Sequence, residues 1–181
     1  MTPRRATLLA LLLSALNFGG CRSDHPPIAL AENVDLERFM GDWYVIANIP
    51  TRIEREAWGA VESYRREPDG TVATTFTFHK GGFDGERKAY TPRALVKPGT
   101  GNAVWGMQFV WPVKADYRIV WLAPDYSQVV IGREARDYVW IMAREPSIPE
   151  ANYERLVDFI AQQGYDASKI RKVPQRPQGD G

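Results

Sequence analysis

Short runs of β-branched and aromatic residues recur at near-regular spacing through the middle of this 181-residue chain. Turn-forming residues separate the runs, for example Pro68-Asp69-Gly70 and Pro124-Asp125. Connections this short join antiparallel neighbours, so the pattern predicts an all-β domain, either a sandwich or an up-and-down barrel. We expect eight strands, over Asp42–Ile49, Trp58–Arg65, Thr71–His79, Glu86–Val96, Asn102–Val110, Ala115–Leu122, Gln128–Arg133 and Tyr138–Arg144.

Residues 147–164 carry the pattern of one amphipathic helix. Ser147 and Glu150 have the spacing of a capping box, and Gly164 follows the helix as a C-terminal cap. Apolar residues recur on one helix face: Tyr153, Leu156, Val157 and Ile160. Because several strands are apolar on both faces, we expect this helix to cover the outside of the sheet. Residues 170–173 predict a short final strand.

The first twenty residues have the order of a secretory signal: two arginines, an apolar run over residues 6–18, and two glycines before Cys21. The glycine pair followed by the single cysteine resembles the lipobox of bacterial lipoproteins. The resemblance implies that Cys21 is acylated and that residues 21–33 form a tether. It also implies a location on the bacterial outer membrane, facing the periplasm, because Arg22 follows the cysteine. The alternative is ordinary signal cleavage that leaves a free thiol.

The charge and cysteine content exclude several classes of protein. Lys and Arg number 23 against 22 Asp and Glu, which gives no cationic excess for a broad nucleic-acid surface. One cysteine permits no intrachain disulfide, and two histidines leave no cluster for structural zinc. No phosphate loop or serine elbow is present, and His79 lies at a predicted strand end without a nucleophile motif. We therefore expect no cofactor and no catalytic residues.

Three motifs, in order along the chain, resemble the signatures of the lipocalin family. Gly41 and Trp43 match the opening Gly-x-Trp motif. Asp125 and Tyr126 match the second motif, a turn after a strand, and the third motif contains Arg144. The resemblance is strongest to the bacterial outer-membrane lipoprotein lipocalins, which are apolipoprotein D-like.

This resemblance covers residues 34–175 and leaves 176–181 as a frayed tail. It implies an eight-stranded antiparallel up-and-down β-barrel, with one C-terminal α-helix packed outside and a short final strand. It also implies that Trp43 and Arg144 stack at the closed end of the barrel. Strand alternation agrees, since Trp43 shares a face with Val45 and Arg144 shares one with Met142. We expect this pair to have a structural role.

An eight-stranded barrel has room for one small ligand. The resemblance implies a fatty acid or a lysophospholipid, bound for storage or transport, with the headgroup near the mouth. Strand alternation gives candidate ligand-binding residues: Tyr64, Phe76, Phe78, Trp105, Met107, Phe109, Tyr117, Ile119, Trp121, Tyr138 and Trp140. The same alternation places Val45, Ala47, Ala60, Ala89 and Met142 among the candidates.

Other interpretations remain open. Many of the candidates could simply fill the core, which would make the chain a structural envelope protein with a filled barrel. A lipid-acting ester hydrolase is a further alternative. The sequence does not decide whether Glu62 and Arg93 face the interior or solvent, and it allows a homodimer.

Overall fold

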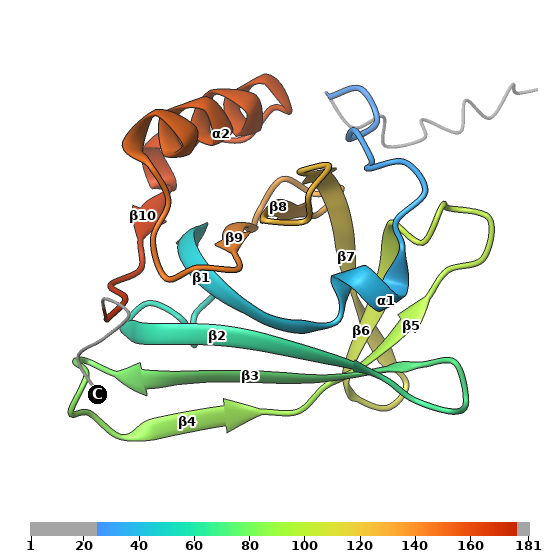
Figure 1. Cartoon of the computed structure of the whole chain (residues 1–181), viewed down its shortest axis with the longest axis horizontal. Coiled ribbons are helices and arrows are strands. Elements are labelled where there is room, and N and C mark those ends of the chain that lie inside the picture. Colours follow the sequence, from blue (N-terminus) through green and yellow to red (C-terminus); the bar gives the residue numbers. More distant parts are fainter. Residues whose placement is uncertain (1–24, 177–181) are drawn as a thin grey trace, which may run out of the picture.

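The computed structural model describes residues 25–176, so the predicted signal and Cys21 lie outside the described residues. The strands are β1 (Gly41–Ile49), β2 (Ala57–Arg66), β3 (Val72–Lys80), β4 (Arg87–Tyr90), β5 (Arg93–Val96), β6 (Val104–Val110), β7 (Val113–Leu122), β8 (Gln128–Gly132), β9 (Val139–Ala143) and β10 (Arg171–Lys172). Neighbours pair antiparallel, and β9 returns to β1 and closes the sheet (Figure 1). The predicted eight-stranded barrel is confirmed.

The expected strand over residues 86–96 is divided in two. Both halves, β4 and β5, pair with β3, and Pro92 lies between them. Proline has no amide hydrogen to donate to a neighbouring strand, so the pairing is interrupted there. The proline carbonyl still accepts a bond of 3.1 Å from the amide of Thr74. β4 and β5 together therefore occupy one position in the barrel. Ala89, which faces outward opposite Thr77, was wrongly expected inside.

Two register shifts change which side chains face the interior. In β1 the pairing with β9 shifts between Val45 and Ala47, and in β7 the pairing with β8 shifts between Ile119 and Trp121. An extra residue in a strand reverses the alternation beyond it. Val45 and Ile119 therefore lie in the barrel core, whereas Ala47 and Trp121 pack in the cluster outside the barrel. The expectation that Ala47 and Trp121 line the interior was wrong.

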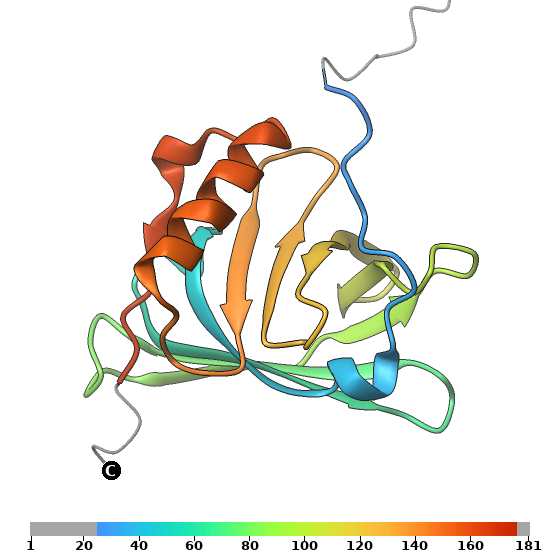
Figure 2. The ribbon, with the colours of Figure 1, turned by 45° about the horizontal axis from the view of Figure 1, so that its top comes forward.

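Helix α2 (Glu150–Gln162) covers the outside of the barrel, as expected (Figure 2). Leu156 and Ile160 are buried in a cluster with outward-facing residues of β1, β8 and β9. The predicted capping box is wrong: Pro149 occupies the N-cap position and no side chain caps the helix. The C-terminus matches expectation, since Gly164 adopts a φ of +90° and the Tyr165 amide bonds back to the Ile160 carbonyl.

Two short helices were not anticipated. Helix α1 (Leu36–Phe39) precedes β1, and the side chain of Asp35 caps it by accepting from the amides of Glu37 and Arg38. Its last residue, Phe39, is fully buried inside the barrel. The one-turn 3-10 helix η1 (Ala167–Lys169) leads into β10, which pairs with β1. Helix α1 thus supplies the aromatic side chain that begins to close one end of the barrel.

Candidate ligand-binding cavity

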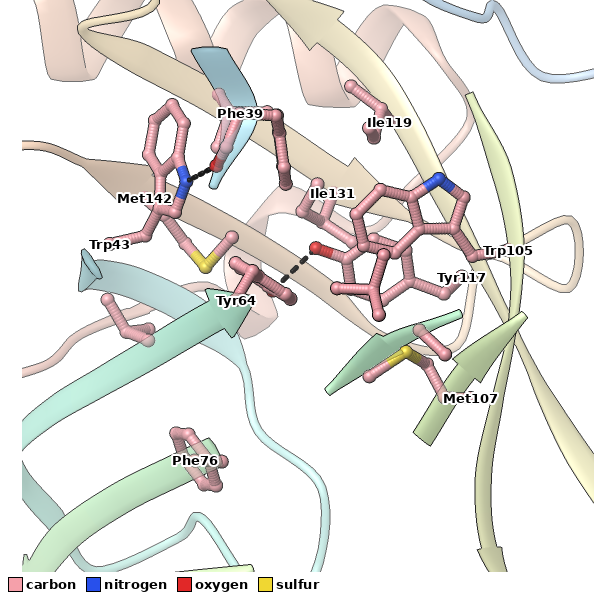
Figure 3. Packing of buried hydrophobic residues seen from close by; sticks show 14 of the residues in the cluster. Phe39, Trp43, Tyr64, Phe76, Trp105, Met107, Tyr117, Ile119, Ile131 and Met142 are labelled. Atoms are coloured by element: carbon pink, nitrogen blue, oxygen red, sulfur yellow. Dashed lines mark hydrogen bonds between the residues drawn. The ribbon is translucent and has the colours of Figure 1, made fainter. Parts of the chain in front are cut away.

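Aromatic side chains fill the end of the barrel next to α1. The ring centroid of Phe39 lies 5.1 Å from that of Trp43 and 5.4 Å from those of Tyr64 and Trp105. Trp105 in turn stacks on Tyr117 at 5.3 Å (Figure 3). The Trp43 indole donates to the Phe39 carbonyl at 2.9 Å, so its polar atom is satisfied. This packing closes the barrel floor.

Hydrogen bonds from Arg144 hold the floor of the barrel in place from outside. Its guanidinium donates to the carbonyls of Asp42 at 2.8 Å, Arg38 at 2.8 Å and Phe39 at 3.1 Å. Partial burial lowers the pKa of Arg144, while Asp42 acts in the opposite direction. Gly41 has a φ of +93°, and a Cβ there would lie 3.4 Å from the guanidinium. The first and third motifs therefore meet at one structural junction.

The second motif serves the same end of the barrel. Asp125 accepts hydrogen bonds from the amide and hydroxyl of Ser127, which fixes the turn, and these bonds lower the pKa of Asp125. Tyr126 has a φ of +64°, and its hydroxyl accepts from the Asp35 amide at 2.8 Å. The Arg38 guanidinium lies 4.0 Å from the centre of the Tyr126 ring. The turn after β7 is thus tied to the segment that carries α1.

The opposite half of the barrel encloses a cavity of about 420 Å³, within the range of small-molecule sites. Most of its wall is apolar, and its mouth lies at the β1–β2 and β8–β9 loops and the end of β6. The residues that line it are Thr51, Arg52, Ile53, Glu54, Glu62, Phe76, Pro92, Met107, Phe109, Ala115, Asp116, Tyr117, Ile131, Arg133, Tyr138, Trp140 and Met142.

The candidate ligand-binding residues fall into three groups. Those that line the cavity are Phe76, Met107, Phe109, Tyr117, Tyr138 and Trp140. Those that are buried inside the barrel without lining the cavity are Tyr64, Phe78, Trp105 and Ile119. Trp121 lies outside, among the side chains under α2. The barrel is therefore partly filled by its own aromatic residues, and only its open half remains for a ligand.

The β1–β2 loop contributes a buried carboxylate that sequence alternation did not single out. Glu54 accepts from the indole of Trp140 at 2.7 Å and from the amide of Thr51 at 2.8 Å. Both carboxyl oxygens therefore have a donor, which offsets the cost of burial. The pair fixes the Trp140 ring in the cavity wall.

Glu62 faces the cavity, which decides its orientation. It lies on β2 and accepts a hydrogen bond from the hydroxyl of Tyr64. Burial raises the pKa of Glu62 to about 7; the bond from Tyr64 opposes this shift and the charge of Glu54 adds to it. A carboxyl group in an apolar wall is thus poised between its neutral and charged forms near neutral pH. Arg93, in contrast, is exposed and lies 3.5 Å from Asp69.

Arg133 brings a positive charge to the mouth. One guanidinium nitrogen, Nη1, lies 3.1 Å from Asp137, and the guanidinium carbon lies 5.4 Å from the centre of the Tyr138 ring. Its Nε is buried and has no hydrogen-bond partner among residues 25–176. The Arg133 side chain as a whole is 25% exposed and lines the cavity, so its guanidinium group is suited to pair with an anionic group placed at the mouth.

The hairpin between β6 and β7 gives one side of the mouth an apolar rim. Phe109 is 57% exposed and Trp111 is 82% exposed, and Val110 and Val113 are exposed beside them. Phe109 also lines the cavity. Large apolar side chains exposed together at a cavity mouth indicate a surface that meets apolar molecules.

Neither His79 nor a cluster of metal-ligating side chains contributes to the cavity in residues 25–176. His79 sits at the end of β3, where its Nδ1 lies 3.0 Å from the Gly85 carbonyl oxygen, and it does not line the cavity. No group of three or more metal-ligating side chains occurs within this range. None of the helices described there is both long enough and apolar enough to cross a membrane.

A family model described as a lipocalin-like domain matches residues 34–175. The chain belongs to the lipocalin family. It is 32% identical to temperature-induced lipocalin-1 of Arabidopsis thaliana over 157 residues, which are 81% of this chain and 82% of the relative. It is 26% identical to the outer membrane lipoprotein Blc of Escherichia coli strain K12 over 184 residues, covering 95% and 98% of the two chains.

A solved structure with the same fold is that of insecticyanin from the tobacco hornworm Manduca sexta. The TM-score is 0.64 at 18% sequence identity, and the match covers 84% of this chain and 86% of insecticyanin. At this identity the likeness establishes the fold. Together with the apolar cavity, membership of the family supports binding or transport of a small hydrophobic ligand.

Proposed function

We propose that this lipocalin binds a fatty acid or a lysophospholipid, holding the single acyl chain in the cavity and the headgroup at the mouth. The observation that carries the proposal is a cavity of about 420 Å³ with a mainly apolar wall and one open end. A single chain fits the lining of Phe76, Met107 and Met142 without requiring a polar partner.

The orientation follows from where charge can be accommodated. At the closed end, Trp43 and Arg144 are already engaged with each other and with backbone carbonyls. At the mouth, the guanidinium group of Arg133, whose side chain is 25% exposed, can meet a carboxylate or phosphate. The acyl chain therefore enters first and passes over the apolar rim at Phe109 and Trp111.

Binding or transport without a catalytic step accounts for the side chains that line the cavity. The polar side chains of the cavity wall include no serine or cysteine nucleophile next to a histidine. A lipid-acting hydrolase with a serine or cysteine nucleophile would need such a pair. A purely structural protein with a filled barrel would leave no cavity, so the open half of the barrel argues against this alternative.

The proposal includes anchoring through Cys21 in the bacterial outer membrane, with the barrel in the periplasm. The signal-like run that ends at Cys21 supports it, as does the similarity to proteins named outer membrane lipoprotein. Several acyl chains would give a stable anchor. Membrane fractionation of Cys21→Ser tests this: the variant should leave the membrane fraction, and its full retention there would contradict the anchoring.

Binding itself is tested with delipidated protein and a panel of saturated fatty acids of increasing length. Each buried methylene contributes about 0.8 kcal/mol, so affinity should rise with length until the cavity is full and then level off. Tryptophan fluorescence can report it, since Trp140 lines the cavity. Native mass spectrometry with lysophospholipids then identifies the preferred headgroup.

Two variants of β6 localise the site. Met107→Asp puts a charge into the cavity wall and should abolish binding. Gln108→Asp introduces the same charge on the next residue, which is paired with the exposed Arg93 and does not line the cavity, and should bind as the parent does. Equal affinity for short and long acids, or unchanged binding by Met107→Asp, would show that the cavity is not the site.

A further inference from the structure

Three polar side chains form a chain of hydrogen bonds inside the mainly apolar barrel. The hydroxyls of Tyr64 and Tyr117 lie 2.7 Å apart, and Tyr64 also bonds to one carboxyl oxygen of Glu62. The side chains come from β2 and β7, which are not neighbours in the sheet, so the chain crosses the barrel interior. Figure 3 shows the bond between the two tyrosines beside the packed floor.

These groups lie where the cavity meets the floor. Tyr64 packs against Phe39 and Trp105 of the floor, whereas Glu62 and Tyr117 line the cavity. The residues paired with Glu62 on the adjacent strands, Trp43 and Phe76, are both apolar. A ligand that fills the cavity from the mouth therefore meets this polar group with its leading end.

Hydrogen bonds in the described part of the chain occupy only one of the two carboxyl oxygens of Glu62. Tyr117 can donate to Tyr64, and Tyr64 donates to one oxygen of Glu62. The second carboxyl oxygen has no hydrogen-bond partner among the residues that the structure describes, and the side chain lines the cavity. A plain methyl end placed against it would remove it from water without replacing the lost hydrogen bond, which is unfavourable.

We infer that Glu62, with Tyr64 and Tyr117, forms a polar subsite at the inner end of the cavity that binds a hydroxyl or amino group on the leading end of an otherwise apolar ligand. The inference rests on the proposed function, because it takes the cavity to be the ligand site. It refines the ligand class from simple acyl chains to chains with a hydrogen-bond donor far from the headgroup. Sites built to hydrogen-bond a ligand discriminate against analogues that lack the group.

The other charged side chains of the cavity already have protein partners or lie at the mouth. Glu54 is bonded to Trp140 and Thr51, and Asp116 is paired with Arg118 at 3.0 Å. Arg52 and Arg133 belong to the β1–β2 and β8–β9 loops at the mouth. Glu62 is therefore the cavity carboxyl with an oxygen available to a ligand. Because the pKa of Glu62 is raised to about 7, its charge grows across neutral pH.

The test compares saturated fatty acids with ω-hydroxy fatty acids of the same length, from about eight to about sixteen carbons. Both series carry the same carboxylate for the mouth and differ only at the leading end. The full-length protein should prefer the hydroxy acid by about tenfold at the length that reaches Glu62, the effect of about one hydrogen bond to a charged group. It should show no such preference at shorter lengths. Glu62→Leu should lose the preference and bind the plain acid more tightly, while Glu56→Gln, on an exposed side chain, should behave as the parent.

An ω-amino fatty acid provides a second readout that does not depend on the leucine variant folding. Its ammonium group stays charged from about pH 6 to about pH 8, while Glu62 gains negative charge over this range. Affinity should therefore rise with pH in the parent, and Glu62→Gln should remove the rise.

The outcomes separate the two proposals. In one outcome, saturated fatty acids bind and Met107→Asp blocks them, but no ω-hydroxy fatty acid of any length is preferred and the affinity for the ω-amino fatty acid does not depend on pH. The subsite is then refuted and the proposed function stands. If neither series binds in the cavity, both proposals are refuted.

Discussion

The guanidinium of Arg144 lies across the indole of Trp43, with its central carbon 3.8 Å from the ring centroid. Trp43 lies on β1, the first strand of the barrel, and Arg144 lies on the segment that follows β9. The pairing of β1 with β9 closes the sheet. The same guanidinium donates to two backbone carbonyls of α1, those of Arg38 and Phe39, and to the carbonyl of Asp42 at the start of β1. One side chain therefore joins barrel closure to the formation of the floor.

Arg144→Ala should lower the free energy of unfolding by about 2–4 kcal/mol, through loss of the cation–π contact and of charge-assisted hydrogen bonds. Affinity for fatty acid should change little, because Arg144 does not line the cavity. Urea unfolding measures the first quantity and fluorescence titration the second. Arg144→Lys, which keeps the charge but has no planar fork, should recover only part of the loss. Unchanged stability with lost binding would instead assign Arg144 to the ligand site.

Glu62 should make the stability of the empty barrel depend on pH. Its pKa is raised in the folded state to about 7, so the folded protein binds more protons than the unfolded chain between about pH 4.5 and about pH 7. Stability should therefore fall as pH rises through this window, by up to about 3 kcal/mol, and level off above it.

The comparison for this pH effect is Glu62→Gln, which has no titrating proton at this position. The variant should be more stable than the parent at about pH 8 and similar to it at about pH 4.5. Thermal or urea unfolding at both pH values checks this. A parent and variant with the same pH profile would show that the carboxyl is well solvated.

The spacing of short strands and turns predicted an all-β domain and left a sandwich and a barrel open, and the resemblance to the lipocalin motifs implied the barrel. Strand alternation correctly placed the floor residues Tyr64 and Trp105 inside, whereas the inward position of Trp43 came from the resemblance to the lipocalin family. Alternation failed beyond the register shifts in β1 and β7, at Ala47 and Trp121, since one inserted residue exchanges the two faces and leaves no mark in composition.

The cavity was less predictable than the barrel. Alternation cannot separate a side chain that lines a cavity from one that fills the core, so Phe78 and Ile119 could not be distinguished from Phe76. Glu54 and Arg133 lie in or next to loops, where no period applies. A charged residue close to a strand end was the available sequence signal, and such residues are too common for the signal to be specific.

Substitutions of two tryptophans should affect stability and binding differently. The register shift in β7 places Trp121 outside the barrel, whereas Trp140 on β9 lines the cavity. Trp121 packs outside the barrel near α2, so Trp121→Ala should lower stability, by about 1–3 kcal/mol, without changing affinity for fatty acid. Trp140→Phe should weaken binding and reduce the fluorescence response, because Trp140 lines the cavity and is held there by Glu54. Weakened binding in the Trp121 variant, at unchanged stability, would contradict the placement of the shift.

Arg133 should contribute to affinity through the charge of the headgroup. Arg133→Gln removes the positive charge but keeps a long polar side chain, and its backbone bonds to the Tyr165 hydroxyl are unaffected. We expect affinity for a fatty acid to fall about five- to tenfold, the effect of one charge-assisted hydrogen bond at a partly exposed site. Affinity for the uncharged alcohol of the same length should not change.

Arg93→Gln is the matched control for Arg133→Gln, since it makes the same change of charge at an exposed residue that does not line the cavity. Arg93→Gln should leave the affinities for the fatty acid and for the alcohol as in the parent. In Arg133→Gln, the fatty acid should lose its advantage in affinity over the alcohol at low salt as well as at high salt. If both variants weakened acid binding equally, and added salt removed the difference from the parent, the effect would come from the net charge of the protein. In that case the headgroup would be held by a contact other than the guanidinium group of Arg133.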